Sequence, residues 1–126
     1  MKDQQILAIE NFVRSYNVFD INGMIKDLHS NVVFENISSG KVDLKTEGIP
    51  AFKKQAESAI HFFKQRQQTI KSWDFQNEKV IIGIDYKAVL AMDLPNGMKS
   101  GDTLKLKGQS EFLFQDDKII GIKDIS

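Results

Sequence analysis

The spacing of hydrophobic residues changes along this chain from a helical to a strand-like period, and this change limits its possible folds. In residues 3–17, Ile6, Ile9, Val13 and Tyr16 recur every three or four positions, as on the buried face of an amphipathic helix. After residue 66, hydrophobic and polar residues alternate, which is typical of half-buried strands. Helices followed by consecutive strands predict an α+β fold.

Capping and turn residues divide the first half further. Asp20 is a suitable N-cap for a second, short helix, and residues 32–37 are predicted to form a strand. The polar, glycine-flanked stretch 38–48 predicts a loop with room for a short strand. A third helix is expected from Ile49–Pro50, because proline is tolerated in a first turn. Its expected buried residues are Phe52, Ala56, Ala59, Ile60 and Phe63.

The second half predicts an antiparallel meander of strands joined by short polar turns. In the strand before Asn77, strict alternation places Trp73 and Phe75 on one face and Ile70 on the other. The even-numbered residues of 80–90 share a hydrophobic face, and those of 103–114 share another. The last strand is expected at 118–125, and the sequence LPNG before residue 98 is a strong turn signal.

Length and charge exclude several classes of protein. The 126 residues suit one domain, so we expect a single domain over residues 1–126. Lysine plus arginine and aspartate plus glutamate each number 17, which argues against a nucleic-acid or membrane-surface protein. The hydrophobic runs are too short for a membrane span, and the polar start MKDQQ does not resemble a signal peptide. We therefore expect a cytoplasmic protein.

The residues that usually bind metals are scarce or badly spaced. The chain has no cysteine, which excludes disulfides and thiolate chemistry. His29 and His61 belong to no recognisable ligand spacing, so we expect no metal site. No glycine-rich phosphate loop is present, and we expect no cofactor.

The order of the predicted elements, together with three sequence stretches, resembles the nuclear-transport-factor-2-like superfamily and its SnoaL-like branch. The stretches are FDINGMIKDLHSNVVFEN, EGIPAFKKQ and SEFLFQDDKIIGIKDIS, and the resemblance covers nearly the whole chain. It implies three N-terminal helices packed in the concave face of a strongly curved, mainly antiparallel sheet, a cone or half-barrel. It also implies a hydrophobic pocket inside the cone and a homodimer formed through the sheet.

Ketosteroid isomerase, one branch of this superfamily, provides a test of function. Its catalytic base lies on the first strand, where the matching string here is FEN, so Asn36 takes that position. An amide cannot accept a proton near neutral pH. Phe12 takes the position of the donor tyrosine, and Ser110 that of the protonated aspartate donor. Because none of the three positions matches, the chain is not expected to be a ketosteroid isomerase.

The resemblance places several side chains at the pocket, each with an alternative role. Asn36 shares a strand face with Phe34, and its amide either bonds a ligand carbonyl or satisfies the loop backbone. Tyr16, one turn beyond Phe12, supplies a hydroxyl to the pocket or is a core residue with a bonded tip. Trp73 either stacks on a flat ligand or packs in the core or a dimer interface.

The last two strands add further candidates. Ser110 shares the apolar face of Phe112, where it is either a ligand donor or a small residue that makes room. Asp124 either points inward, where burial would raise its pKa for acid–base work, or lies at a solvated strand end. Asp85 is expected on the face opposite Tyr86, towards solvent or an interface.

Two functions follow from these candidates. The first is a pocket protein that binds a small hydrophobic or aromatic ligand through Phe12, Tyr16, Phe34, Asn36, Trp73, Ser110 and Phe112. The alternative is an enzyme of the isomerase, cyclase or dehydratase type that uses an acid such as Asp124. A titratable group with a shifted pKa in the pocket would favour the enzyme, whereas neutral donors alone would favour binding.

Overall fold

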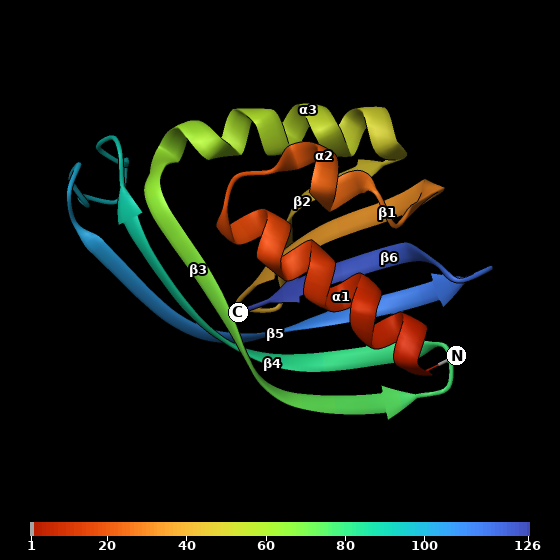
Figure 1. The fold of residues 1–126 in the computed structure, drawn as a ribbon. Coiled ribbons are helices and arrows are strands. Elements are labelled where there is room, and N and C mark those ends of the chain that lie inside the picture. The colour runs from red at the N-terminus through yellow and green to blue at the C-terminus, as the bar shows by residue number, and fades with distance from the viewer. Residues whose placement is uncertain (1) are drawn as a thin grey trace.

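A computed structural model describes residues 2–126, which form an α+β fold of helices packed on one six-stranded, strongly curved mixed sheet (Figure 1). The strand order is β2-β1-β6-β5-β4-β3, and the sheet does not close into a barrel. The elements are α1 (Lys2–Asn17), α2 (Ile21–Ile25), β1 (Leu28–Ser38), β2 (Lys41–Glu47), α3 (Ile49–Ala59), η1 (Ile60–Phe62), β3 (Phe63–Gln76), β4 (Lys79–Leu90), β5 (Thr103–Gln115) and β6 (Lys118–Ile125). The predicted fold class is confirmed.

The helices begin where the sequence predicts. Helix α1 buries Ile9, Phe12 and Val13 on one side, as its periodicity requires. Asp20 caps α2, because its carboxylate accepts a hydrogen bond from the backbone N–H of Gly23 at 2.9 Å. Helix α3 ends at Ala59, so the prediction that Ile60 and Phe63 belong to its buried stripe is wrong, and Ile60 lies in η1. Phe63 instead begins strand β3.

The sheet brings the first and the last strand of the chain side by side. Strands β3 to β6 form the predicted antiparallel meander, and the segment predicted as a loop contains β2, which pairs antiparallel with β1. Strand β1 pairs in parallel with β6, so the sheet is mixed. This pair places the first strand beside the last one and brings polar residues from both into one row.

Strand β3 departs from strict alternation at two bulges, one near its start and one in its middle. The register with β4 shifts between Ile70 and Ser72, so Ile70 lies opposite Ile84 whereas Trp73 lies opposite Ile82. One extra residue turns the strand by one position, which reverses the faces of the residues beyond it. The prediction that Ile70 and Trp73 lie on opposite faces is therefore wrong, because both pack against the core.

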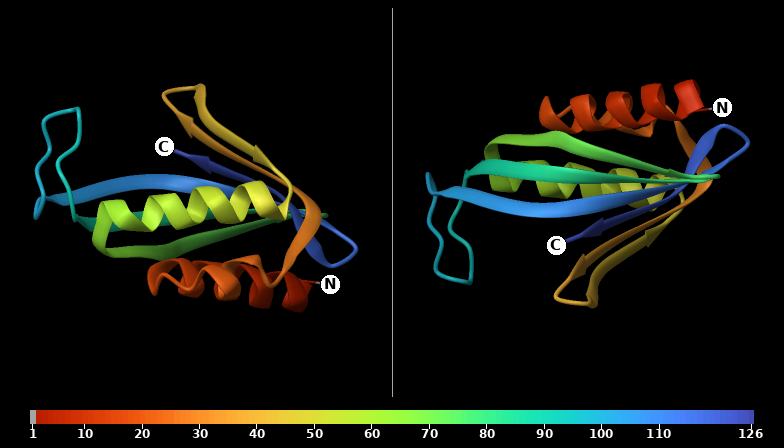
Figure 2. Two further views of the ribbon diagram at one scale, coloured as in Figure 1. Left: turned by 90° about the horizontal axis from the view of Figure 1, so that it is seen from above. Right: turned by 90° about the horizontal axis from the view of Figure 1, so that it is seen from below.

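The hydrophobic core lies between the helices and the concave side of the sheet. The ring of Phe12 on α1 contacts those of Phe52 on α3 and Phe112 on β5, with centroids 6.1 and 5.8 Å apart. In both views of Figure 2, α1 lies on one side of the sheet, and the β1–β2 hairpin tip projects on the other. Helix α1 thus packs on the sheet through Phe12, and α3 packs on α1 through Phe52.

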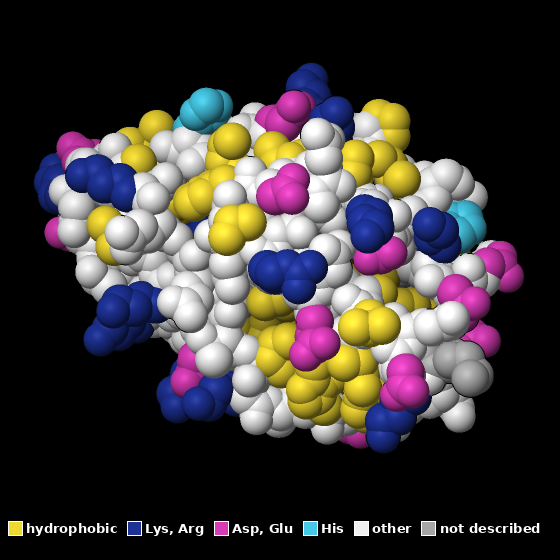
Figure 3. Space-filling view, viewed as in Figure 1, with side chains coloured by type: hydrophobic (Ala, Val, Ile, Leu, Met, Phe, Trp, Pro, Cys, Tyr) yellow, Lys and Arg dark blue, Asp and Glu magenta, His cyan; other side chains and the backbone are white. Residues whose placement is uncertain are grey.

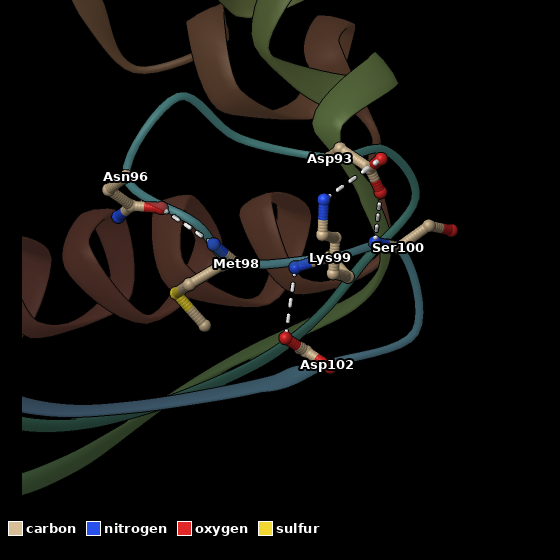
Figure 4. A network of polar contacts seen from close by, with 6 residues as sticks. All are labelled: Asp93, Asn96, Met98, Lys99, Ser100 and Asp102. Atoms are coloured by element: carbon tan, nitrogen blue, oxygen red, sulfur yellow. Dashed lines mark hydrogen bonds and ion pairs between the residues drawn. The ribbon is translucent and has the colours of Figure 1, made fainter.

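The β4–β5 connection is held by short polar contacts (Figure 4). Asp93 accepts a hydrogen bond from the Ser100 N–H, and Asp102 accepts one from the Lys99 N–H, both at 2.9 Å. The predicted turn is present, because the Gly97 N–H donates to the Leu94 carbonyl at 3.2 Å.

No helix within residues 2–126 is both long and apolar enough to cross a membrane.

Candidate functional site

Three polar side chains meet in one row across the centre of the sheet. In the strand registers, Asp124 of β6 lies between Asn36 of β1 and Ser110 of β5. Ser110 donates a hydrogen bond from Oγ to Oδ1 of Asp124 at 2.7 Å. The even-numbered faces predicted for β1 and β5 therefore converge on a carboxylate from the last strand.

Two hollows adjoin this row and share Tyr16, Asn36 and Asp124. We call the first the helix-side chamber; it has a volume of about 180 Å³. Its lining is largely apolar and includes Phe12, Met24, Phe34, Leu44, Phe52 and Phe63. The second, the sheet-side hollow, has a volume of about 210 Å³ and is lined by Tyr86, Ser110 and residues of the β6 end. Both volumes lie below the roughly 300 Å³ of a typical ligand pocket, so each hollow suits only a small organic molecule or part of a larger one.

Asp124 has the electrostatics of a proton-transfer group. Burial raises the pKa of its carboxyl from 3.8 to about 6, and the hydrogen bond from Ser110 partly offsets this rise. The residue lines both hollows, so its carboxylate borders the space that a ligand would fill. A carboxyl with a pKa near 6 exchanges protons readily at neutral pH.

Two tyrosines form a hydrogen-bonded pair next to Asp124. The hydroxyl groups of Tyr16 and Tyr86 lie 2.9 Å apart. Burial raises the pKa of both hydroxyls, and the charge of Asp124 raises them further. Both tyrosines thus stay protonated, and because the bond between them uses one proton, the other hydroxyl proton remains to be donated to a ligand.

Asn36 borders both hollows, but its amide also has a partner on β2. Its Nδ2 lies 3.4 Å from Oδ2 of Asp43, a long hydrogen bond at the protein surface. This contact uses the amide nitrogen and orients the side chain at the end of the row. Asn36 is therefore placed to contact a ligand and is also tied to the sheet edge.

The remaining predicted residues fall into two groups. Phe12 and Phe34 line the helix-side chamber. Phe112 is 1% exposed and lies behind Phe12, and Trp73 stacks on Phe75 with ring centroids 5.7 Å apart. Neither Phe112 nor Trp73 lines the two hollows. Figure 3 shows hydrophobic side chains gathered around the lower part of α1, next to β3, the strand that carries Trp73.

Two residues of the site, Tyr86 and Arg66, were not predicted from the sequence. Tyr86 carried a usable signal, because it lies on the alternating hydrophobic face of residues 80–90. Arg66 stands in the polar stretch KQRQQ, where a solvent-exposed side chain is the ordinary expectation. The structure instead buries Arg66 in the wall of the helix-side chamber, with 5% of its surface exposed.

The site offers acid–base chemistry rather than a metal-ligand set. Within residues 2–126, no three histidine or acidic side chains lie close enough to hold a metal ion together. Asp124 is a proton acceptor or donor, and the tyrosine pair is a hydrogen-bond donor. A carboxylate beside a neutral donor in an apolar chamber is suited to removing a proton from carbon while an oxyanion is stabilised.

Comparison with known proteins gives structural relatives only. Neither a protein-family model nor a curated protein matches the sequence. A proposed polyketide cyclase from Xanthomonas campestris pv. campestris superposes with a TM-score of 0.82 at 16% identity, over 98% of this chain and 90% of that one. A proposed SnoaL-like polyketide cyclase from Jannaschia sp. CCS1 superposes with a TM-score of 0.81 at 10% identity, over 97% and 84% of the two chains.

A third relative has bound a small molecule. It is a protein with a ketosteroid isomerase-like fold from Catenulispora acidiphila, in complex with trimethylamine. Its TM-score is 0.77 at 9% identity, over 93% of this chain and 82% of that one. These likenesses establish the fold of the chain and confirm the fold that the sequence resemblance implies.

Proposed function

From the fold of the nuclear-transport-factor-2-like superfamily, which this chain has, we propose that the protein is an acid–base enzyme. Its substrate is a small hydrophobic or aromatic molecule that fills the helix-side chamber. Asp124 transfers the proton, in a reaction of the isomerase, cyclase or dehydratase type. The relatives described as polyketide cyclases support a reaction of this class, because their fold is the same.

The raised pKa of Asp124, in a carboxyl that borders the chamber, carries this proposal. A protein that only binds a hydrophobic ligand gains nothing from a carboxylate there, because the charge costs free energy to bury. Neutral donors such as Asn36 and the tyrosine pair would suffice for binding. These features support catalysis over binding alone.

The proposed reaction uses the carboxyl group of Asp124 and the hydrogen-bonded hydroxyls of Tyr16 and Tyr86. Above pH 6 the Asp124 carboxylate accepts a proton from an acidic C–H of the substrate. The free hydroxyl proton of the Tyr16–Tyr86 pair donates a hydrogen bond to the oxygen on which negative charge develops. The protonated Asp124 then returns the proton at another position, which completes an isomerisation, or to a leaving hydroxyl in a dehydration.

Elimination of 5-nitrobenzisoxazole tests this proposal without knowledge of the natural substrate. A base removes the proton on the ring carbon, its electron pair forms a nitrile, and the N–O bond breaks to give a coloured phenolate. We expect the second-order rate constant of the protein to exceed that of free acetate, per carboxylate, by on the order of 100-fold or more. The value of kcat/KM should rise with pH to a plateau with a midpoint near 6, because Asp124 must lose its proton to act.

Asp85→Asn is the matched control for this assay. Asp85 lies on β4 opposite Lys107 of β5, outside both hollows, so its substitution should leave the rate and the pH profile unchanged. A rate no higher than that of acetate would contradict the proposal. A pH profile without a midpoint near 6 would assign the reaction to another group.

A further inference from the structure

Arg66 is a cation built into the wall of the helix-side chamber. It lies on β3 with 5% of its surface exposed. Its Nε donates a hydrogen bond to the backbone carbonyl of Tyr16 at 2.8 Å, which fixes the side chain against α1. The guanidinium carbon lies 3.7 Å above the ring centre of Tyr16 and 4.5 Å from that of Phe19. Two aromatic rings therefore pack against the guanidinium group.

The Arg66 guanidinium has unused hydrogen-bonding capacity. Its Nη2 is buried and has no hydrogen-bond partner among the described residues. The ion pairs found in residues 2–126 join other side chains, at Lys45, Lys79 and Lys99. Ring contacts offset part of the cost of burying the charge, but they do not satisfy an N–H group that points along the guanidinium plane. A buried guanidinium in this state lacks an anion.

We propose that Arg66 binds a carboxylate of the ligand, so that the protein acts on small aromatic or otherwise hydrophobic acids. This inference rests on the proposed function and names its substrate class. A carboxylate is the anion that suits the forked N–H groups of arginine, and its pairing would supply the missing partner of Nη2. The rest of the molecule would contact the apolar lining, chiefly Phe12, Phe34 and Phe52.

The arrangement also separates the two charged ends of the site. Arg66 comes from β3, at one edge of the sheet, whereas Asp124 comes from β6, two strands beyond β4. Both border the same chamber, and Tyr16 lies at its wall with them. A substrate anchored by its carboxylate at Arg66 would extend towards Asp124. The Asp124 carboxylate would then contact a C–H group of the substrate and not the substrate carboxylate, which would repel it. Anchoring at a distance from the reacting atoms is how binding energy is used for positioning.

Paired probes of equal shape and different charge test this inference. Cinnamate and cinnamamide differ only in that one carries a carboxylate and the other a neutral amide, and binding of each is measured by calorimetry at pH 7.5. We expect the protein to bind cinnamate at least about tenfold more tightly than cinnamamide. Arg66→Met should reduce this ratio to about one. Arg14→Met, which changes the exposed arginine of α1, should leave the ratio unchanged.

A second measurement remains valid if Arg66→Met fails to fold. The Nε–H of Arg66, which its bond to Tyr16 protects, is followed by nitrogen–proton NMR in the unmodified protein. Cinnamate should shift this signal, and cinnamamide should not. Equal or weaker binding of cinnamate, binding of neither probe, or an unmoved Nε–H signal would overturn the inference.

The two proposals fail separately. Nitrobenzisoxazole carries no carboxylate, so its Asp124-dependent turnover does not need Arg66 to bind an anion. Turnover without a preference for cinnamate would refute the anion site and leave the acid–base function standing. A preference for cinnamate without turnover would refute the acid–base function and leave an acid-binding pocket.

Discussion

Replacing Asp124 with asparagine is expected to lower nitrobenzisoxazole elimination at pH 8 by on the order of 100-fold or more, because an amide cannot accept the proton. The same substitution should raise the free energy of unfolding at pH 8 by about 3 kcal/mol. The stability effect follows from the burial that raises the pKa of Asp124 to about 6, because the buried charge is costly. A residue that supports catalysis at the expense of stability is characteristic of an active site.

The sign of the stability effect depends on pH. Above pH 6 the carboxylate is ionised in the folded and the unfolded protein, but its charge is costly only in the folded one. Below the ordinary pKa of 3.8 both states are protonated, and this cost is absent. The stability that Asp124 contributes in its protonated form is thus lost as pH rises through about 6. The gain from asparagine should therefore be full at pH 8 and vanish towards pH 4.

Urea unfolding at pH 8 and at pH 4 measures this difference, with Asp85→Asn as the control that should show no such pH dependence. An Asp124→Asn protein that is less stable at pH 8 would contradict the burial of an ionised carboxylate. Full activity in a folded Asp124→Asn protein would remove Asp124 from the mechanism.

Phe112→Ala is expected to lower the free energy of unfolding by about 4 kcal/mol. Phe112 is 1% exposed, and its ring meets that of Phe12 edge-on at 5.8 Å between centroids. Removing the ring leaves a cavity behind Phe12, which itself lines the helix-side chamber. The substitution should therefore also weaken the binding of cinnamate, because the chamber wall loses its support.

Leu113→Ala is the natural comparison, because Leu113 follows Phe112 on the same strand but is 47% exposed. Its loss should change stability by less than about 1 kcal/mol in urea unfolding. A Phe112→Ala protein as stable as Leu113→Ala would show that this ring does not hold the helices on the sheet.

Periodicity and turn residues predicted most of the elements, because each depends on neighbouring residues alone. The α1 stripe, the Asp20 cap and the β4 face are examples. The bulge in the middle of β3 was not predictable in this way, since nothing in the alternation marks an extra residue beside Ile70. The parallel β1–β6 pair depends on tertiary packing over the length of the chain, and it was not predicted either.

The same division applies to the site. The alternation of faces along each strand was sufficient to predict that Asn36 and Ser110 face the pocket. It could not decide whether Asp124 points inward, because a residue at the end of a strand can face either way. Only the registers of three strands show that Asp124 stands between them. Arg66 was not predictable, because the burial of an arginine depends on aromatic rings that come from another helix.

The most direct test of the central claim, that Asp124 is a proton-transfer group held in an apolar pocket, is a carbon NMR titration of its carboxyl. The signal is assigned by its absence from Asp124→Asn. We expect a titration midpoint near pH 6, coincident with the midpoint of the kcat/KM profile. A midpoint near the ordinary 3.8 would mean that the carboxyl is solvated, and the account of this site would be wrong.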